Sequence, residues 1–363
     1  MKINFLIRSL YKSGGIERVT CNLANLFIAR GIDVSIITQD SDCASFYTLN
    51  NDVKLYSLHI DERASNESRW TYKMKIIKAL RAHINQEQPD IVLAIWSDMS
   101  SYAVLAAIHT NTKVIACEHL AYEGLRLASR AEYYLRILIY PFADAIVALT
   151  KRDTNRYKRM NKYAHTIPNF VDLPMCEQDV QKENVVLAVG HITYRKGFDM
   201  LIEAWKQVHD IVPNWKLKII GAKGEPEYGQ MLQSRIEELG LTNNIQILKE
   251  TKNITMEYQK ASIFVMSSRQ EGLPMVMLEA MLMGLPVVSF DCPTGPREII
   301  ADGENGYLVE NGDINELSQK LVMLIEDGIK RERYAKSAIQ HINEQFGKDN
   351  VFKMWQKIFD NTK

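Results

Sequence analysis

Short runs of β-branched and other apolar residues alternate with helix-length segments along most of the chain. These runs lie at residues 3–7, 34–38, 91–96, 113–117 and 145–149, and again at residues 185–189, 216–220, 245–247, 263–266, 287–290 and 307–309. Strands that are buried on both faces are apolar throughout, and helix-length connections between them give parallel sheets. The pattern therefore predicts two doubly wound α/β domains.

The length of the chain also favours two domains, because 363 residues exceed what one core usually supports. We place the boundary in residues 168–184, where Asn-Phe-Val-Asp-Leu-Pro interrupts the periodicity before a polar stretch. Ligands of doubly wound sheets bind outside the carboxyl ends of the strands. We therefore expect the functional site in the cleft between two such domains.

Charge and cysteine content restrict the class of protein. Residues 1–170 hold 22 Lys and Arg against 16 Asp and Glu, whereas the remainder holds 22 against 28. The basic half indicates either an anionic partner or a solvated surface. The five cysteines have no C-x-x-C spacing, which argues against a disulfide framework and a zinc site and favours a reducing cytosol. The first residues are typical of a strand rather than a signal peptide, and no apolar run is long enough to span a membrane.

Glu271 and Glu279 flank the start of an otherwise apolar segment. Glu279 is the only charged residue in 272–290, and Pro274 and Gly284 suit the beginning and end of a helix. A buried carboxylate at mid-helix needs a hydrogen-bond partner. The free N–H groups at the helix entrance, with the positive end of the helix dipole behind them, favour an anionic ligand.

A second motif follows the strand at residues 185–189. It runs from Gly190 through His191, Arg195 and Lys196 to Gly197, and it ends where a helix begins. Lys and Arg beside helix N–H groups are suited to holding a diphosphate. The alternative is a solvated Arg-Lys pair without a ligand.

Two further motifs follow strands of the first domain. Gly14 and Gly15, with Glu17 behind them, allow close backbone approach to a ligand or form a plain turn. His119 lies just after the strand at residues 113–117 and has either a structural or a catalytic role.

Two patterns carry less weight. Asp40 and Asp42 match a metal-binding D-x-D pattern, but no third ligand converges on them, so we attribute the match to chance. Residues 69–81 and 125–140 are basic and carry aromatic and aliphatic residues at helical spacing. They predict helices that lie either on an anionic membrane surface or on an ordinary protein surface.

Taken together, these motifs resemble the retaining glycosyltransferases of family 4, the glycosyl transferases group 1. The matching segments are Gly14-Gly15 with Glu17, Glu118-His119, residues 167–172, residues 189–197, the pair Glu271 and Glu279, residues 293–299 and residues 305–309. The resemblance covers nearly the whole chain. One departure is His191, which stands where the family usually carries arginine; Arg195 is a candidate to supply the guanidinium instead.

The resemblance implies the GT-B fold, with two facing Rossmann-like domains and a cleft between them. Residues 1–170 would bind the acceptor and residues 171–344 the nucleotide sugar, with a helix over about residues 345–363 packed back on the first domain. The chain would be a retaining, metal-independent hexosyltransferase that needs no cofactor beyond its donor substrate.

The resemblance also assigns roles to individual residues. The catalytic residues would be His119, Lys196 and Glu271, and the acceptor would bind at Gly14, Gly15 and Glu17. The donor would be bound by Gly15, Gly190, His191, Arg195, Lys196, Glu271, Gly272, Leu273, Pro274, Met275 and Glu279.

The expected reaction moves an N-acetylhexosamine or hexose from a UDP-sugar to a glycan acceptor. That acceptor would be a lipid-linked diphosphate oligosaccharide of bacterial O-antigen, capsule or exopolysaccharide assembly, at the inner face of the cytoplasmic membrane; no nucleic acid partner is expected. A GDP-mannose-dependent mannosyltransferase and a UDP-sugar 2-epimerase are the alternatives. A dinucleotide-dependent oxidoreductase is disfavoured, because no G-x-G-x-x-G follows a strand. A non-enzymatic sugar-binding module would not need the two glutamates.

Overall fold

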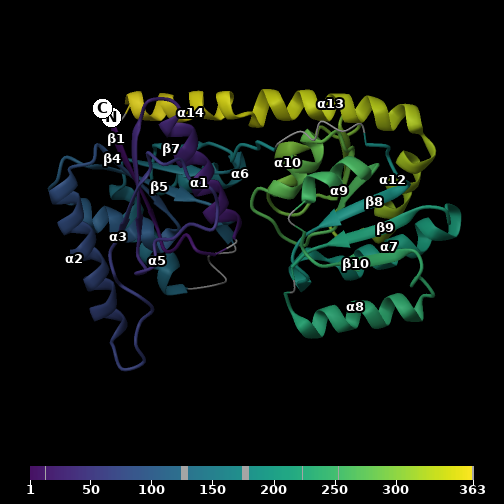
Figure 1. Cartoon of the computed structure of the whole chain (residues 1–363), viewed down its shortest axis with the longest axis horizontal. Coiled ribbons are helices and arrows are strands. Elements are labelled where there is room, and N and C mark those ends of the chain that lie inside the picture. Colours follow the sequence, from purple (N-terminus) through teal and green to yellow (C-terminus); the bar gives the residue numbers. More distant parts are fainter. Residues whose placement is uncertain (13, 124–129, 174–179, 223, 252, 362–363) are drawn as a thin grey trace. The chain divides into compact units, whose positions relative to one another are not determined.

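The computed structural model describes residues 1–12, 14–123, 130–173, 180–222, 224–251 and 253–361. The chain splits into two compact units (Figure 1). Unit 1 comprises Met1–Asn169 together with Val351–Lys363, and unit 2 comprises Phe170–Asn350. The division lies at the start of the aperiodic segment at residues 168–184.

Unit 1 is built on a seven-stranded sheet in the order β3-β2-β1-β4-β5-β6-β7, and all of its strand pairs are parallel. The strands are β1 (Lys2–Ile7), β2 (Asp33–Thr38), β3 (Lys54–Ser57), β4 (Ile91–Ile95), β5 (Lys113–Glu118), β6 (Ala145–Ala148) and β7 (Ala164–Thr166). The helices are α1 (Gly15–Ile28), α2 (Arg69–Glu87), α3 (Ser97–Ala107), α5 (Arg130–Ile139), the short 3₁₀ helix η1 (Tyr140–Phe142) and α6 (Lys151–Tyr157).

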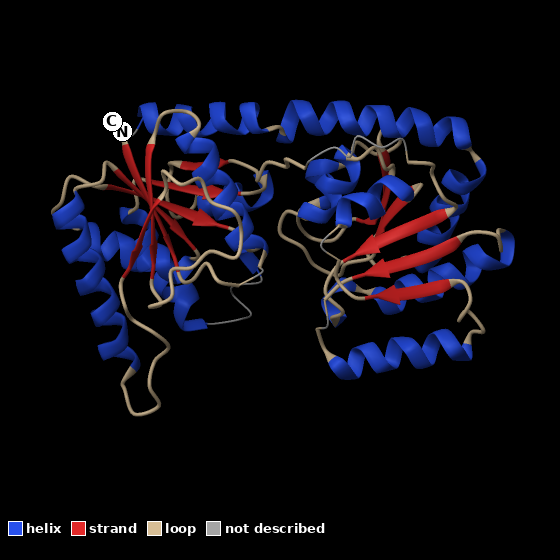
Figure 2. Ribbon diagram, in the orientation of Figure 1, coloured by secondary structure: helices blue, strands red, loops and turns tan. Residues whose placement is uncertain are grey.

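Unit 2 is built on a six-stranded parallel sheet in the order β10-β9-β8-β11-β12-β13. Its strands are β8 (Val185–Val189), β9 (Lys216–Ile220), β10 (Ile245–Leu248), β11 (Ile263–Met266), β12 (Val287–Phe290) and β13 (Gly306–Val309). Its helices are η2 (Tyr194–Lys196), α7 (Phe198–Ile211), α8 (Pro226–Glu238), α9 (Ile254–Lys260), α10 (Met275–Leu282), α11 (Pro296–Ile299), α12 (Ile314–Glu326) and α13 (Gly328–Phe346). Figure 2 shows helices on both faces of the strands in each unit.

The prediction of two doubly wound α/β domains is confirmed, and all eleven predicted strands are present within one or two residues. The central strands were predictable because they are buried on both faces; in β4, for example, all five residues are buried. The sequence analysis missed β3 and β7. Both are edge strands, and β3 carries no fully buried residue, so neither shows a continuous apolar run.

The last helix, α14 (Lys348–Asn361), packs its aromatic face on α1 of unit 1. The ring of Phe27 lies 6.0 Å from that of Phe352, 5.9 Å from that of Trp355 and 5.5 Å from that of Phe359. Edge-on aromatic pairs of this kind add to the free energy gained by burying the rings. The aromatic face of α14 is therefore part of the core of the first unit.

Candidate active site

A buried ion pair joins two loops of unit 2. The Lys196 Nζ lies 2.6 Å from the Glu271 Oε1, and the Ser268 hydroxyl donates to the same oxygen at 2.6 Å. The Arg195 guanidinium lies 3.4 Å from the other carboxylate oxygen and donates to the Gln270 carbonyl. The structure therefore brings together three of the predicted site residues, Arg195, Lys196 and Glu271.

The cations around Glu271 keep it ionised. Burial of the carboxyl favours the protonated form, but the charges of Lys196 and Arg195 and the hydrogen bonds outweigh it and hold the pKa of Glu271 below its usual range. Lys196 and Glu271 are 9% and 6% exposed. Both charges are therefore largely withdrawn from water, and each depends on the other.

The loop that carries Lys196 is fixed by residues that the sequence analysis did not identify. The Arg269 guanidinium donates to both carboxylate oxygens of Asp199, at 2.8 and 2.6 Å, and to the Tyr194 carbonyl. It also stacks on the ring of Tyr194, 3.8 Å from its centre. This arginine clamp, formed by Arg269, Asp199 and Tyr194, ties η2 to the loop that leads to Glu271.

Gly197 allows the same two loops to approach closely. Its φ of +65° is in the left-handed region, and an added Cβ would lie 2.0 Å from the Ser267 carbonyl oxygen. A side chain at this position would push the backbone of the two loops apart. Gly190 similarly leaves room for Lys196, because an added Cβ would lie 3.1 Å from the Lys196 Cε.

Helix α10 begins at Met275, four residues after Glu271, so Glu271 lies in the loop that leads into the helix, as predicted. Pro274 is the N-cap, with extended backbone, rather than the first helical residue expected from the sequence. The segment after β12 supports this entrance: the Thr294 hydroxyl donates to the Glu271 carbonyl, and Gly295, at a φ of +96°, lies against Gly272. The Met277 and Leu278 N–H groups donate to the Pro274 carbonyl, so the N–H groups of α10 that have no acceptor in a preceding turn of helix are those of Met275 and Val276.

Glu279 is buried in the middle of α10 and has the hydrogen-bond partner that its position requires. The Tyr258 hydroxyl, on α9, donates to the Glu279 Oε2 at 3.0 Å. Both side chains are buried. The need for a partner was predictable from the lone charge, but the identity of Tyr258 was not, because it comes from a different helix.

The structure distinguishes between His191 and Arg195 as replacements for the arginine that the family usually carries after the glycine. His191 is exposed, and its side chain makes no hydrogen bond or ion pair with any described residue. Arg195 is four residues further along and contacts Glu271. Within the described part of unit 2, Arg195 is therefore the second cation of the site.

An open hollow of about 460 Å³ lies beside this loop, at the carboxyl ends of β8, β9 and β10. It is lined by Ile192, Gly221, Gly224, Glu225, Pro226, Gly229, Gln230, Gln233, Ile247, Leu248 and Lys249. Its position and size suit an organic ligand.

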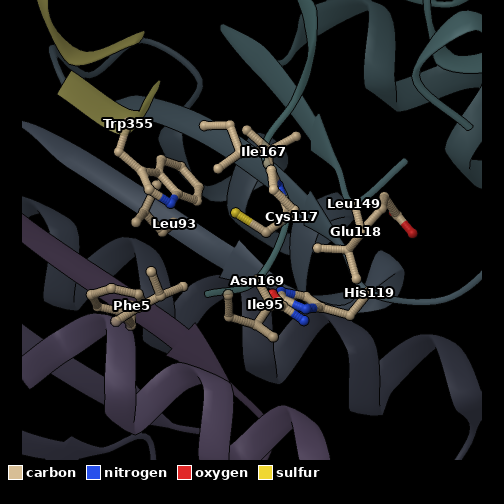
Figure 3. A pocket seen from close by; sticks show the side chains of 13 residues that line it. Phe5, Leu93, Ile95, Cys117, Glu118, His119, Leu149, Ile167, Asn169 and Trp355 are labelled. Atoms are coloured by element: carbon tan, nitrogen blue, oxygen red, sulfur yellow. The ribbon is translucent and has the colours of Figure 1, made fainter. Parts of the chain in front are cut away.

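In unit 1, His119 follows β5 and lines a small cavity of about 10 Å³ (Figure 3). The Nδ1 atom is buried and has no hydrogen-bond partner among the described residues. Burial lowers the pKa of His119 to about 4, so the imidazole is neutral at pH 7. The cavity is large enough for about one water molecule, so a substrate could meet His119 only from its exposed side.

A buried network holds the end of β5 in place. The Tyr140 hydroxyl donates to Glu118, whose other oxygen lies 3.8 Å from the Arg136 guanidinium, and Arg136 donates to Tyr157 at 2.7 Å. Burial raises the pKa of Glu118, although Arg136 and Tyr140 oppose that shift. The network includes Glu118, the residue before His119, and was not predicted from the sequence.

The glycine loop of unit 1 precedes α1. Gly14 is the N-cap, Gly15 is exposed with open space beside it, and Glu17 lies in the first turn. These residues and His119 belong to unit 1, whereas the other predicted site residues belong to unit 2.

The remaining sequence patterns have structural explanations. In the described part of the chain no three His, Cys, Asp or Glu side chains come together as a metal site, and Asp42 accepts from the Ala44 N–H. The described cysteines, Cys21, Cys43, Cys117 and Cys292, are free thiols; Cys176 lies outside the described residues.

Among the described helices, none is both long and apolar enough to cross a membrane. Large apolar side chains are exposed on the two basic segments that the sequence places either on a membrane or on an ordinary protein surface. Trp70 is in the first turn of α2, and Tyr134 and Leu138 lie on α5, with Phe142 just beyond it. Residues 125–129 of the second segment lie outside the described residues.

Two family models match the chain and together span most of it. The model described as Glycosyl transferases group 1 matches residues 177–341, and the model described as Glycosyltransferase Family 4 matches residues 13–174. The chain belongs to this glycosyltransferase family.

Curated relatives of the family resemble the chain over its whole length. The amylovoran biosynthesis glycosyltransferase AmsD of Erwinia amylovora is 29% identical over 99% of each chain. The GalNAc-alpha-(1->4)-GalNAc-alpha-(1->3)-diNAcBac-PP-undecaprenol alpha-1,4-N-acetyl-D-galactosaminyltransferase of Campylobacter jejuni is 28% identical over 100% of this chain and 99% of that protein. The structure of Anabaena HepE in complex with UDP and glucose matches with a TM-score of 0.79, 20% identity and 99% coverage of both chains, so it shares the fold.

Proposed function

We propose that the protein is a retaining glycosyltransferase that moves an N-acetylhexosamine or hexose from a UDP-sugar to a glycan acceptor. The observation that carries the proposal is the buried Lys196–Glu271 pair, with Arg195 beside it at the entrance of α10. Two cations beside helix N–H groups suit a nucleotide diphosphate. Glu279 lies within α10, eight residues after Glu271, and provides a carboxylate for the ribose hydroxyls.

In the proposed mechanism, binding and catalysis use the same cations. Cleavage of the bond between the sugar and the diphosphate leaves negative charge on the departing nucleotide, and Lys196 and Arg195 stabilise that charge. Glu271 and the backbone of residues 272–275 face the donor sugar. No metal ion is needed in this scheme, because the two cations and the dipole of α10 supply the positive charge.

In this proposal His119 contacts the donor sugar or the acceptor and does not act as a general base. As a neutral imidazole it can donate or accept a hydrogen bond with the sugar or the acceptor. A leaving phosphate oxygen, rather than His119, would assist deprotonation of the acceptor hydroxyl on the same face of the sugar.

We further propose that the acceptor is a lipid-linked diphosphate glycan bound by unit 1. The C. jejuni relative is named for an undecaprenol diphosphate acceptor, and residues 1–170 of this chain carry the basic excess. Exposed Trp70, Leu138 and Phe142 near basic residues suit contact with an anionic membrane. Failure to bind both anionic liposomes and undecaprenyl-diphosphate sugars, together with transfer to soluble acceptors, would refute this acceptor class.

A thermal-shift panel of UDP-, GDP- and ADP-sugars tests the donor, because only the cognate nucleotide should stabilise the protein strongly. The UDP and glucose found with HepE, which shares the fold, favour UDP. A response to GDP-mannose alone would instead support a mannosyltransferase. Incubation of the protein with its cognate donor and no acceptor distinguishes the two reaction classes. An epimerase would convert the donor sugar, whereas a transferase would leave it unchanged.

The ribose role of Glu279 has its own test. In the wild type, 2′-deoxy-UDP or 3′-deoxy-UDP should bind more weakly than UDP, because one hydrogen bond to a charged group is lost. The expected loss of binding free energy is about 1.5–3 kcal/mol. In Glu279→Ala the deoxy analogue and UDP should bind equally. An undiminished preference for UDP in the variant would remove Glu279 from the ribose.

A further inference from the structure

A second polar hollow, which the proposed donor site does not use, opens at the carboxyl edge of the unit 1 sheet. Its volume is about 350 Å³, within the usual range for small-ligand sites. Arg8, Gln39, Asp40, Tyr72, Asp98 and Tyr102 are among the residues that line it. Arg8, Gln39 and Asp98 follow β1, β2 and β4, whereas Tyr72 and Tyr102 lie on α2 and α3. The strand order reverses between β1 and β4, which is the point at which doubly wound sheets bind ligands.

The walls of this hollow, called here the β1–β4 pocket, are held in place by their own contacts. The Arg8 guanidinium pairs with Asp98, and the Gln39 amide donates to the Tyr72 hydroxyl at 2.7 Å. Trp96, between β4 and α3, has a φ of +85°. Such a value is rare for a bulky side chain and persists only where the surrounding structure enforces it.

Two polar groups in the wall are not used by the protein. The Asp40 carboxylate and the Tyr102 hydroxyl make no hydrogen bond with any described residue. The two residues are only 9% and 5% exposed, but neither polar group is among the side-chain oxygens shut off from solvent, so both face the open pocket. They are therefore available to hydrogen-bond a ligand there.

The charges of the pocket indicate what kind of ligand this is. Three basic side chains, Arg8, Lys12 and Arg63, are balanced by three acidic ones, Asp40, Glu62 and Asp98. Arg8 is paired with Asp98, which leaves Lys12 and Arg63 against Asp40 and Glu62. The pocket therefore has no net positive charge to hold a phosphate, whereas neutral hydroxyl groups can both donate to Asp40 and accept from Tyr102.

We propose that the β1–β4 pocket binds an uncharged sugar residue of the acceptor, and that Asp40 and Tyr102 hydrogen-bond its hydroxyl groups. The inference rests on the proposed function only in naming this sugar as part of the acceptor. Lys12 lies in the same loop as Gly14 and Gly15, so the pocket extends the acceptor region predicted from the sequence. It also explains Asp40 as a sugar ligand rather than as half of a metal-binding D-x-D pattern.

The test is direct binding of methyl glycosides of glucose, galactose, N-acetylglucosamine and N-acetylgalactosamine, measured by titration without any donor. The variants are Asp40→Asn and Tyr102→Phe. Asp42→Asn is the matched control, because Asp42 is exposed in the same loop and does not line the pocket. Sodium diphosphate is the anionic competitor, and the thermal response to UDP reports whether each variant is folded.

We expect at least one glycoside to bind the wild type and Asp42→Asn equally, and to bind Asp40→Asn about tenfold more weakly, as the loss of a hydrogen bond to a charged group predicts. Tyr102→Phe should weaken binding to a smaller extent, and diphosphate should not compete. Absence of glycoside binding, equal binding by folded Asp40→Asn, or competition by diphosphate would each overturn the inference. Glycoside binding without transfer from any nucleotide sugar would refute the proposed function and leave the pocket assignment standing.

Discussion

At the scale of single residues, the decisive contact is the ion pair between Lys196 and Glu271. Removing one member of a buried pair leaves the other charge without compensation, at a cost of about 3–5 kcal/mol. We therefore expect Lys196→Ala to lower the free energy of unfolding, as measured by urea denaturation, and Lys196→Ala combined with Glu271→Gln to recover part of the loss. Activity should not recover in the double variant, because the cation that acts on the departing diphosphate is absent.

Lys206→Ala is the control for that experiment, since Lys206 pairs with Asp210 on the exposed face of α7. Exposed pairs contribute at most about 1 kcal/mol. In Lys196→Ala the turnover number should also fall more than the affinity for the donor. An equal loss of stability in Lys206→Ala, or an unchanged turnover number in Lys196→Ala, would contradict the assigned role.

His119 makes the stability of the protein depend on pH. Burial lowers its pKa from 6.5 to about 4, so the folded state binds fewer protons than the unfolded state between these values. Stability from this residue is therefore complete above pH 6.5 and is lost as the pH falls toward 4, by about 3 kcal/mol at pH 4. His119→Gln should show a correspondingly weaker loss of unfolding free energy over this range, and parallel curves for the two proteins would refute the buried neutral state.

At the scale of elements, the sequence predicted every described strand except β3 and β7, together with the position of α10, but not the contacts between loops. Central strands and the α10 entrance are encoded locally, by apolar runs and by Pro and Gly at its ends. The arginine clamp is not local: Arg269 and Asp199 lie 70 residues apart, and their pairing follows only once β8 and β11 are neighbours. Tyr258 and the β1–β4 pocket escaped prediction for the same reason.

The arginine clamp should matter for catalysis because it positions η2, which carries Arg195 and Lys196. Displacement of a binding group by about 1 Å costs up to about a hundredfold in rate. We expect Arg269→Ala to reduce kcat/KM for the donor by about tenfold to a hundredfold. Arg235→Ala is the matched control, because Arg235 also binds a carboxylate, that of Glu203, but on the exposed side of α8. Equal effects of the two substitutions on kcat/KM would show that the clamp does not position the loop.

At the scale of the whole molecule, the chain consists of two units with separate sheets, and the proposed donor residues Lys196, Glu271 and Glu279 all belong to unit 2. A ligand stabilises the state to which it binds by about 2.7 kcal/mol at a concentration one hundred times its Kd. Hydrogen exchange with saturating UDP should therefore slow in the segments around residues 190–197 and 268–283. The strands β1 and β2 of unit 1 should exchange at unchanged rates. Glu279→Ala, at the same UDP concentration, should lose this protection while keeping the exchange pattern of the unliganded protein. If UDP protected unit 1 and left residues 190–197 unchanged, the donor would have to be assigned to the first unit and the roles of the two sheets exchanged.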